Sequence, residues 1–292
     1  MPFDQVQIDS VRNYWNNRPC NIRHSTQPIG TREYFDEVEA RKYLVEPHIP
    51  AFADFEKWRG KKVLEIGCGI GTDTINFARH GAQVTTVDLS DKSMALARQR
   101  AEVFGLSDRI RFCPGNAEEL ASFVPVEPYD LIYSFGVIHH TPHPDAVLEQ
   151  LRQYTHRAHN SAASDANSAS AAPQTTVKIM VYYKWSWKVG WIVAAEGHGK
   201  FWKLDELVAR SSEAQTGCPI TYTYSRSSGK ALLERHGFHV TDVSVDHIFP
   251  YRIPEYVQYR YVREPYFAWM PPSLFRALER AAGWHLLLTA IA

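Results

Sequence analysis

Short apolar runs alternate along this chain with longer segments in which apolar residues recur every three or four positions. The short runs lie at 62–66, 83–87, 109–113, 128–136, 177–183, 238–245 and 284–291. Such runs are typical of buried parallel strands, whereas the longer segments are typical of amphipathic helices. The helical segments lie at 72–80, 91–104, 145–154, 227–235 and 272–282. The alternation predicts an α/β protein with a doubly wound sheet.

Three parts of the chain do not fit this alternation. Residues 1–60 precede the first predicted strand and contain helical patterns at 11–20, 31–44 and 50–59. Residues 157–176 offer no aromatic or aliphatic anchor, so we expect a disordered insertion there. Residues 247–283 form an aromatic-rich insertion before the last predicted strand. We therefore expect an N-terminal helical region, 1–60, and a core, 61–292, that carries both insertions.

The most informative stretch joins the first predicted strand to its helix. Gly67, Gly69 and Gly71 follow that strand at alternate positions, and such a turn brings bare backbone against a nucleotide-like ligand at a helix N-terminus. Asp88 ends the second run, where a carboxylate can accept hydrogen bonds from a ribose diol. A dinucleotide fingerprint would need glycine at its sixth position, which is Thr72 here.

The pattern E-x-G-x-G-x-G that begins at Glu65, with the Val-Asp pair that ends at Asp88, resembles the class I S-adenosylmethionine-dependent methyltransferases. The resemblance, closest over 58–151, is to the small-molecule, ubiquinone/menaquinone-methyltransferase-like superfamily. It implies a Rossmann-like, seven-stranded sheet with an antiparallel last strand, and S-adenosyl-L-methionine as cofactor. It also implies that the N-terminal region, 1–60, covers the cofactor and one wall of the acceptor pocket. The insertion 247–283 departs from the family's minimal fold, and we expect it to form a lid and part of the acceptor site. The cofactor-binding residues that it implies are Glu65, Gly67, Cys68, Gly69, Gly71, Thr72, Asp88, Leu89, Asn116, Ala117 and Phe135.

Two histidines follow the fourth predicted strand, at the edge of the sheet where ligands bind in open α/β folds. His139 and His140 stand where similar family members place a proposed general base. A neutral oxygen or ammonium acceptor must lose a proton, and histidine is suited to this near neutral pH. Neighbouring side chains diverge in an extended segment, so only one of the two would face the pocket. Both could instead be structural.

Aromatic residues outside the predicted sheet are candidates for the acceptor site. They are Tyr14, Trp15, Tyr34, Trp185 and Trp187. Stacking and cation–π attraction on such rings favour a planar or cationic small molecule. The alternative is that the rings simply pack onto the sheet, as most buried aromatic residues do.

Composition narrows the range of partners. Lys plus Arg and Asp plus Glu are both 32, so the chain lacks the basic surface of a nucleic-acid-binding protein. No apolar run is long enough for a membrane span, and the first residues do not resemble a secretory signal. The four cysteines lack metal or disulfide spacing. We expect a cytoplasmic enzyme without a metal, while the oligomeric state stays open.

The leading hypothesis is transfer of a methyl group from S-adenosylmethionine to an oxygen or nitrogen of a small molecule. One alternative is an NAD-dependent oxidoreductase, which Thr72 disfavours because it replaces the third glycine. A second alternative is an inactive cofactor-binding protein that serves as a partner subunit.

Overall fold

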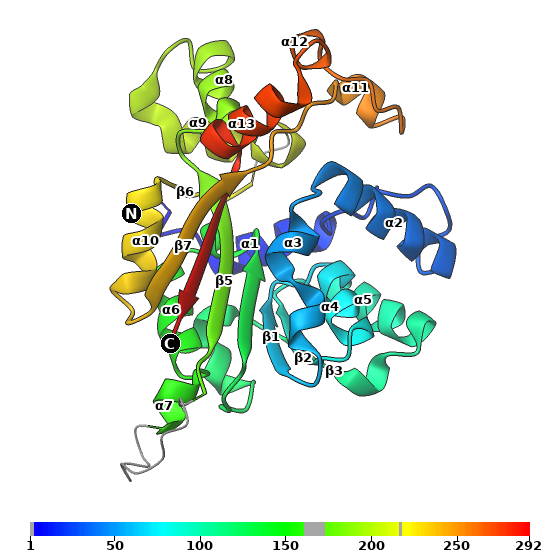
Figure 1. The fold of residues 1–292 in the computed structure, drawn as a ribbon, viewed down its shortest axis with the longest axis vertical. Coiled ribbons are helices and arrows are strands. Elements are labelled where there is room, and N and C mark those ends of the chain that lie inside the picture. Colours follow the sequence, from blue (N-terminus) through cyan, green and yellow to red (C-terminus); the bar gives the residue numbers. More distant parts are fainter. Residues whose placement is uncertain (1–2, 161–172, 216–217) are drawn as a thin grey trace.

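Eight strands form a single sheet in the computed structural model, which describes residues 3–160, 173–215 and 218–292 (Figure 1). They are β1 (Lys62–Ile66), β2 (Gln83–Asp88), β3 (Ile110–Pro114), β4 (Leu131–Phe135), β5 (Thr176–Tyr183), β6 (Thr223–Tyr224), β7 (His239–Asp246) and β8 (His285–Ile291). The strand order is β3-β2-β1-β4-β5-β8-β7, and β6 pairs with β5. β8 runs antiparallel to both β5 and β7, while the pairs among β1 to β6 are parallel.

Helices cover both faces of this sheet. Those beside it are α4 (Thr72–Arg79), α5 (Asp91–Phe104), α6 (Pro144–Arg152), α7 (His156–Asn160) and α10 (Arg226–Glu234). Successive strand residues point to opposite faces. Leu64 therefore packs in a core cluster with residues of α6 and α10, whereas Val63 packs in a second cluster with residues of α4. This two-faced burial explains why apolar residues of β1 lie on both of its faces.

The remaining helices gather around the carboxyl ends of the parallel strands (Figure 1). They are α1 (Ile8–Asn17), α2 (Arg32–Val45), α3 (Ile49–Ala53), α8 (Trp187–Ala195), α9 (Leu204–Gln215), α11 (Ile253–Tyr256), α12 (Pro265–Ala268) and α13 (Pro272–Ala282). The N-terminal region and the late insertion touch one another. Arg41 on α2 donates to the Tyr256 carbonyl at 2.5 Å, and its guanidinium lies 4.1 Å from the centre of the Tyr259 ring.

The doubly wound sheet and its antiparallel last strand confirm the predicted fold class. Two details of the prediction were wrong. The segment 50–59 is not one helix, because Asp54 takes a left-handed conformation between α3 and a 3-10 turn, Phe55–Trp58. The expected loop 215–224 ends in the short strand β6, which makes an eighth strand.

The predicted insertion 157–176 falls mainly outside the described residues. Its first residues belong to α7, and Thr176 begins β5. Thr175 is fully buried, and its hydroxyl donates to the Tyr129 carbonyl at 2.7 Å. Residues 161–172 of the predicted insertion lie outside the described residues, so disorder there stays a prediction.

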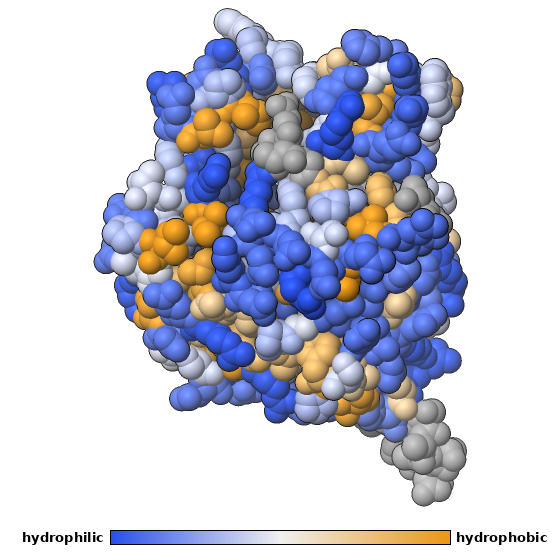
Figure 2. Space-filling model, turned by 180° about the vertical axis from the view of Figure 1, so that it is seen from behind, coloured by the Kyte–Doolittle hydropathy of each residue, from blue (hydrophilic) through white to orange (hydrophobic). Residues whose placement is uncertain are grey.

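The surface is mostly hydrophilic on the face shown in Figure 2, with hydrophobic residues in separate groups between hydrophilic ones. None of the described helices has the length and apolar character needed to cross a bilayer.

Candidate functional site

A cleft lies at the carboxyl ends of the central parallel strands. Its walls include the glycine turn after β1, Asp88 at the end of β2, and Phe135 and Met180 from β4 and β5. Trp15 and Lys42 close it from the N-terminal region, and His285 from β8. The cleft thus lies at the edge of the sheet where ligands bind in open α/β folds.

The glycine turn adopts a backbone that only glycine accommodates readily. Gly67, Gly69 and Gly71 have φ of 79°, 53° and 78°, all in the left-handed region. At Gly67 space is also lacking, because an added Cβ would lie 2.0 Å from a methyl carbon of Val137. The backbone therefore turns sharply out of β1 and exposes Gly67, Cys68 and Gly69 to the cleft.

Asp88 is fixed against this turn. One of its oxygens accepts from the Gly69 N–H and the other from the Ser90 N–H, both at 2.8 Å. Burial raises the pKa of Asp88 to about 6, and the two backbone bonds oppose that rise. Each oxygen keeps a lone pair that can accept from a hydroxyl in the cleft. This pair of acceptor oxygens fits the two donor hydroxyls of a ribose diol.

Glu65 lies behind the turn, away from the residues that line the cleft. Its side chain is buried and accepts hydrogen bonds from the hydroxyls of Thr74 and Thr86. Burial, and then the charge of Asp73, raise its pKa to about 7. These two hydrogen bonds link β1 to α4 and to β2. Glu65 therefore supports the glycine turn between β1 and α4.

The other predicted cofactor residues divide into two groups. Thr72 and Phe135 line the cleft. Leu89 packs in an apolar cluster with N-terminal residues, and Ala117 lies in the main core. The Asn116 side chain accepts from the Glu118 N–H at 3.1 Å and caps a 3-10 turn. These last three residues are not among those that line the cleft.

The two histidines differ in orientation. Both belong to a 3-10 turn, Ile138–His140. His139 is fully buried, and neither ring nitrogen has a hydrogen-bond partner among the described residues. Burial, helped by the neighbouring His140, holds the pKa of His139 well below its ordinary value. Its ring centre lies 3.9 Å from that of Tyr182, so it packs within the fold.

His140 instead lines the cleft. Its Nδ1 lies 2.6 Å from the carbonyl oxygen of Ile220, which can only accept, so Nδ1 carries the proton in this contact. In a neutral ring Nε2 is then the basic nitrogen. The Trp15 ring meets the His140 ring edge-on at 5.5 Å between centres.

Of the five aromatic residues predicted for the acceptor, only Trp15 lines the cleft. Tyr14 contacts Trp15. Tyr34 is 1% exposed, and its hydroxyl donates to the Ile22 carbonyl at 2.8 Å. Trp185 is 62% exposed, and Trp187 packs near Tyr266 and Phe267. Spacing could not separate these cases, because every one of these rings lies outside the predicted strands.

The structure adds polar residues that sequence reasoning missed. Asp73 accepts from Lys42 at 2.8 Å and from the hydroxyls of Tyr43 and Tyr133 at 2.9 and 3.0 Å. Glu46 and His285 line the cleft on another side. These groups come from segments far apart in the chain, so no local motif marked them.

One known protein family matches the part of the chain that contains this site. The family described as "Methyltransferase domain" matches residues 57–212, which include the glycine turn, Asp88 and both histidines. The chain belongs to this methyltransferase family. Its membership confirms the predicted family and cofactor class, and it removes the dehydrogenase alternative.

Curated relatives cover only a part of this methyltransferase. A ubiquinone biosynthesis O-methyltransferase of Bordetella parapertussis is 38% identical over 89 residues, which are 30% of this chain and 36% of the relative. The same enzyme of Psychrobacter cryohalolentis is 34% identical over 90 residues, 31% of this chain and 35% of the relative. The chain thus spans about a third of the length of the curated relatives it matches.

Solved structures of methyltransferases share the fold over nearly the whole chain. Magnesium protoporphyrin IX methyltransferase from Synechocystis, with bound S-adenosylhomocysteine, has a TM-score of 0.57 at 16% identity and covers 98% of this chain and 99% of its own. Geranyl diphosphate C-methyltransferase from Streptomyces coelicolor has a TM-score of 0.55 at 14% identity, with 99% and 98% covered.

Proposed function

We propose that this methyltransferase transfers a methyl group from S-adenosylmethionine to an oxygen or nitrogen of a small planar or cationic molecule. The observation that carries the proposal is the presence of three features in one cleft: the glycine turn, the Asp88 carboxylate and His140. Family membership supports the methyl donor.

The cofactor fits the cofactor end of the cleft chemically. Asp88 would accept from the ribose hydroxyls, and the backbone of Gly67 and Gly69 would approach the methionine part closely, since a glycine carries no side chain. Glu65 would act through the turn that it supports. Bound there, S-adenosylmethionine supplies an electrophilic methyl group on a sulfonium. A nucleophile aligned with the carbon–sulfur bond in a dry cleft is then sufficient for the reaction.

His140 is the general base in this proposal. Its Nε2 takes the proton of an acceptor hydroxyl or ammonium. The acceptor's lone pair then forms the bond to the methyl carbon, and the electrons of the broken carbon–sulfur bond return to sulfur. The bond from Nδ1 to the Ile220 carbonyl keeps the ring in the tautomer that this role needs. We assign His139 a packing role, because it is enclosed between His140 and Tyr182.

Trp15 is the aromatic residue proposed to contact the acceptor, since it lines the cleft beside His140. The relatives are named for ubiquinone biosynthesis O-methylation. A phenolic hydroxyl on a flat ring is therefore the acceptor we favour. A small molecule also agrees with the balanced charge of the chain, which gives no support for a nucleic-acid partner.

The N-terminal region, 1–60, and the insertion 247–283 are proposed as lids over the core, 61–292. The contacts of Arg41 with Tyr256 and Tyr259 support this, because they link the two segments across the cleft side of the sheet. Closure of this kind would exclude water during the transfer.

The test is to measure binding and turnover separately. Calorimetry should detect S-adenosylhomocysteine at micromolar affinity and no binding of NAD. A donor with a labelled methyl group, offered with phenols and with amines, should then label one class of acceptor. Binding without label transfer to any of them would favour the inactive partner-subunit alternative, and absence of binding would refute both.

A further inference from the structure

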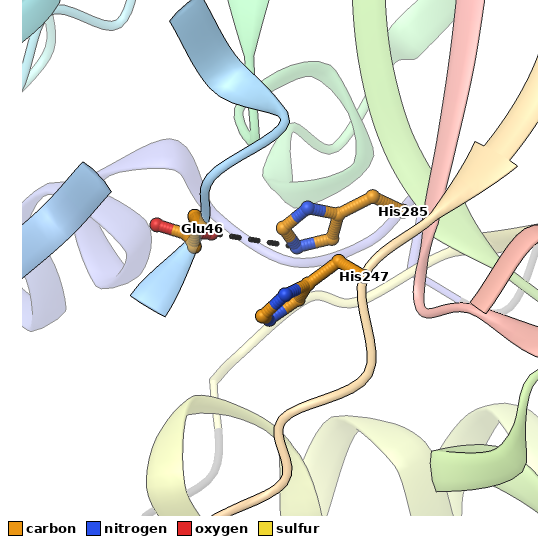
Figure 3. Close-up of side chains that lie close together, drawn as sticks. All are labelled: Glu46, His247 and His285. Carbon is orange, nitrogen blue, oxygen red and sulfur yellow. Dashed lines mark ion pairs between the residues drawn. The ribbon is translucent and has the colours of Figure 1, made fainter. Parts of the chain in front are cut away.

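Three side chains that sequence spacing does not connect lie close together, as Figure 3 shows. Glu46 follows α2, His247 follows β7, and His285 begins β8. One ligand-type atom from each lies within 4.8 Å of the others. The Glu46 carboxylate lies 3.7 Å from Nε2 of His285. Glu46 and His285 also line the cleft that holds the glycine turn and His140.

Both imidazoles of this cluster are buried, so neither ring is exposed to bulk solvent. The Glu46 carboxylate is the third group beside them, and it is partly exposed. An imidazole binds a metal ion through the lone pair of a ring nitrogen, and a carboxylate binds through an oxygen. The three side chains can therefore supply three ligand atoms at one point.

A second layer of contacts orients these rings. Nδ1 of His285 lies 2.9 Å from Nε2 of His48. If Nδ1 of His285 donates in this bond, its Nε2 lone pair is directed to the side of Glu46. The His48 ring also stacks on His247 with 5.4 Å between centres. Asp246 accepts from the His247 N–H at 2.7 Å and pairs with Arg276, which fixes the backbone there.

We propose that Glu46, His247 and His285 bind one divalent transition-metal ion, with Zn²⁺ as the ion to test first. Two imidazoles and one carboxylate suit zinc or ferrous iron better than Mg²⁺ or Ca²⁺, which prefer oxygen ligands. Metal bonds of about 2.0–2.1 Å set tetrahedral ligands roughly 3.4 Å apart. Side-chain shifts of about 1 Å or less would therefore close the present spacing. Three protein ligands leave a coordination position open.

The position of the ion suggests its role, which rests on the function proposed above. The Tyr182 ring contacts both His140 and His285, with 5.4 and 6.2 Å between centres. An ion in this site would lower the pKa of an acceptor hydroxyl at its open position, and the proton would pass to Nε2 of His140 through a water molecule. The acceptor oxygen then bonds to the methyl carbon as the carbon–sulfur bond breaks.

The first experiment tests the site without the reaction. Zn²⁺ alone is titrated by calorimetry into the full, metal-stripped chain, and Co²⁺ is followed by visible absorption. We expect one ion to bind per chain. The affinity for Zn²⁺ should fall at least about 100-fold in Glu46→Gln and in His247→Asn. His48→Gln should weaken it by about 10–100-fold through the second layer. His80→Gln is the matched control, because His80 bonds the Asn76 carbonyl and stacks on Phe55 elsewhere in the chain.

Three results would overturn the site: no binding to the wild type, unchanged binding in both ligand variants, or a cobalt–thiolate charge-transfer band that places the ion on cysteine. Melting curves of each variant show whether a loss of binding reflects a loss of folding.

The second experiment separates this inference from the proposed function. S-adenosylhomocysteine affinity and methyl transfer are measured in the same variants, with and without a chelator. The Lewis-acid role is supported if chelation lowers turnover at least about tenfold and Zn²⁺ restores it. The affinity for S-adenosylhomocysteine should stay unchanged in the same experiment. Turnover that withstands chelation overturns that role while the methyltransferase proposal stands. Zn²⁺ binding without any methyl transfer supports the site and refutes the proposed reaction.

Discussion

The two ends of the cleft are built in different ways. At the cofactor end, the glycine turn and Asp88 come from one continuous β-α-β stretch, and neighbouring strands hold them. At the opposite end, Glu46, His140 and His285 come from three distant parts of the chain and meet only through tertiary packing. The first end depends on local backbone conformation, whereas the second depends on how the N-terminal region and β8 pack together.

In the function proposed above, this difference separates binding from catalysis. A change at the histidine end should slow turnover and leave cofactor affinity nearly intact, while a change at the glycine end should act first on affinity or folding. The predictions below test that separation.

The largest effect is expected from His140→Ala. If His140 is the base, turnover should fall by about 10²–10⁴-fold, the usual contribution of a general base. Affinity for S-adenosylhomocysteine should stay within a few-fold, because Asp88 and the glycine turn remain. Single-turnover kinetics and calorimetry measure the two quantities. Wild-type turnover in His140→Ala from about pH 6 to about pH 9 would show that alignment alone carries the reaction.

The next effect is on folding. Gly67→Ala adds a Cβ at φ 79° that meets Val137 at 2.0 Å, so the left-handed strain and the clash add. We expect a loss of about 2–5 kcal/mol in the free energy of unfolding. Gly105→Ala is the control, since its φ of 66° is similar but its Cβ would meet nothing within 4 Å. It should cost only about 1–2 kcal/mol. Equal losses in urea melts would contradict the close packing of the turn.

A smaller effect is expected from Asp88→Ala. It removes the acceptor proposed for the ribose hydroxyls, at a cost of about 1–3 kcal/mol in cofactor affinity. Turnover at saturating cofactor should change much less. Calorimetry that finds unchanged affinity would refute the assignment of Asp88.

The same carboxylate predicts a pH dependence. Its pKa is raised to about 6, and hydroxyl donors favour the ionised form, so cofactor affinity should be full above about pH 7 and fall below about pH 6. Stability of the ligand-free protein should move the other way. A raised carboxyl pKa contributes stability below its unfolded value and loses it as pH rises through about 6. Asp88→Asn should flatten the affinity profile, and an unaltered profile would assign the titration to another group.

The smallest effect is expected from Tyr34→Phe. Loss of the hydroxyl leaves the Ile22 carbonyl without this donor and should cost about 0.5–1.5 kcal/mol of stability. The KM for the acceptor should not change, because Tyr34 is buried outside the cleft. Trp15→Leu is the contrast and should raise that KM. A raised KM in Tyr34→Phe would restore Tyr34 to the acceptor site.

The sequence predicted the sheet and the glycine turn well because both depend on local patterns. Apolar runs marked β1 and β2, and the glycines marked a turn whose left-handed backbone few other residues allow. It predicted the acceptor end poorly. Trp185 lies exposed and Tyr34 is buried, and only packing separates them. The cluster at His247 and His285 left no spacing pattern, because its members lie on separate elements that the sheet brings together.

The place of β8 in the sheet has a consequence for how the protein is made. β8 is the last strand along the chain, yet it lies between β5 and β7. Its pairing with β5 joins distant segments and therefore forms slowly. On the ribosome, the β1 to β3 half can fold before β8 has been synthesised. The glycine turn and Asp88 are therefore synthesised long before His285, and the cleft is complete only after β8 has joined the sheet.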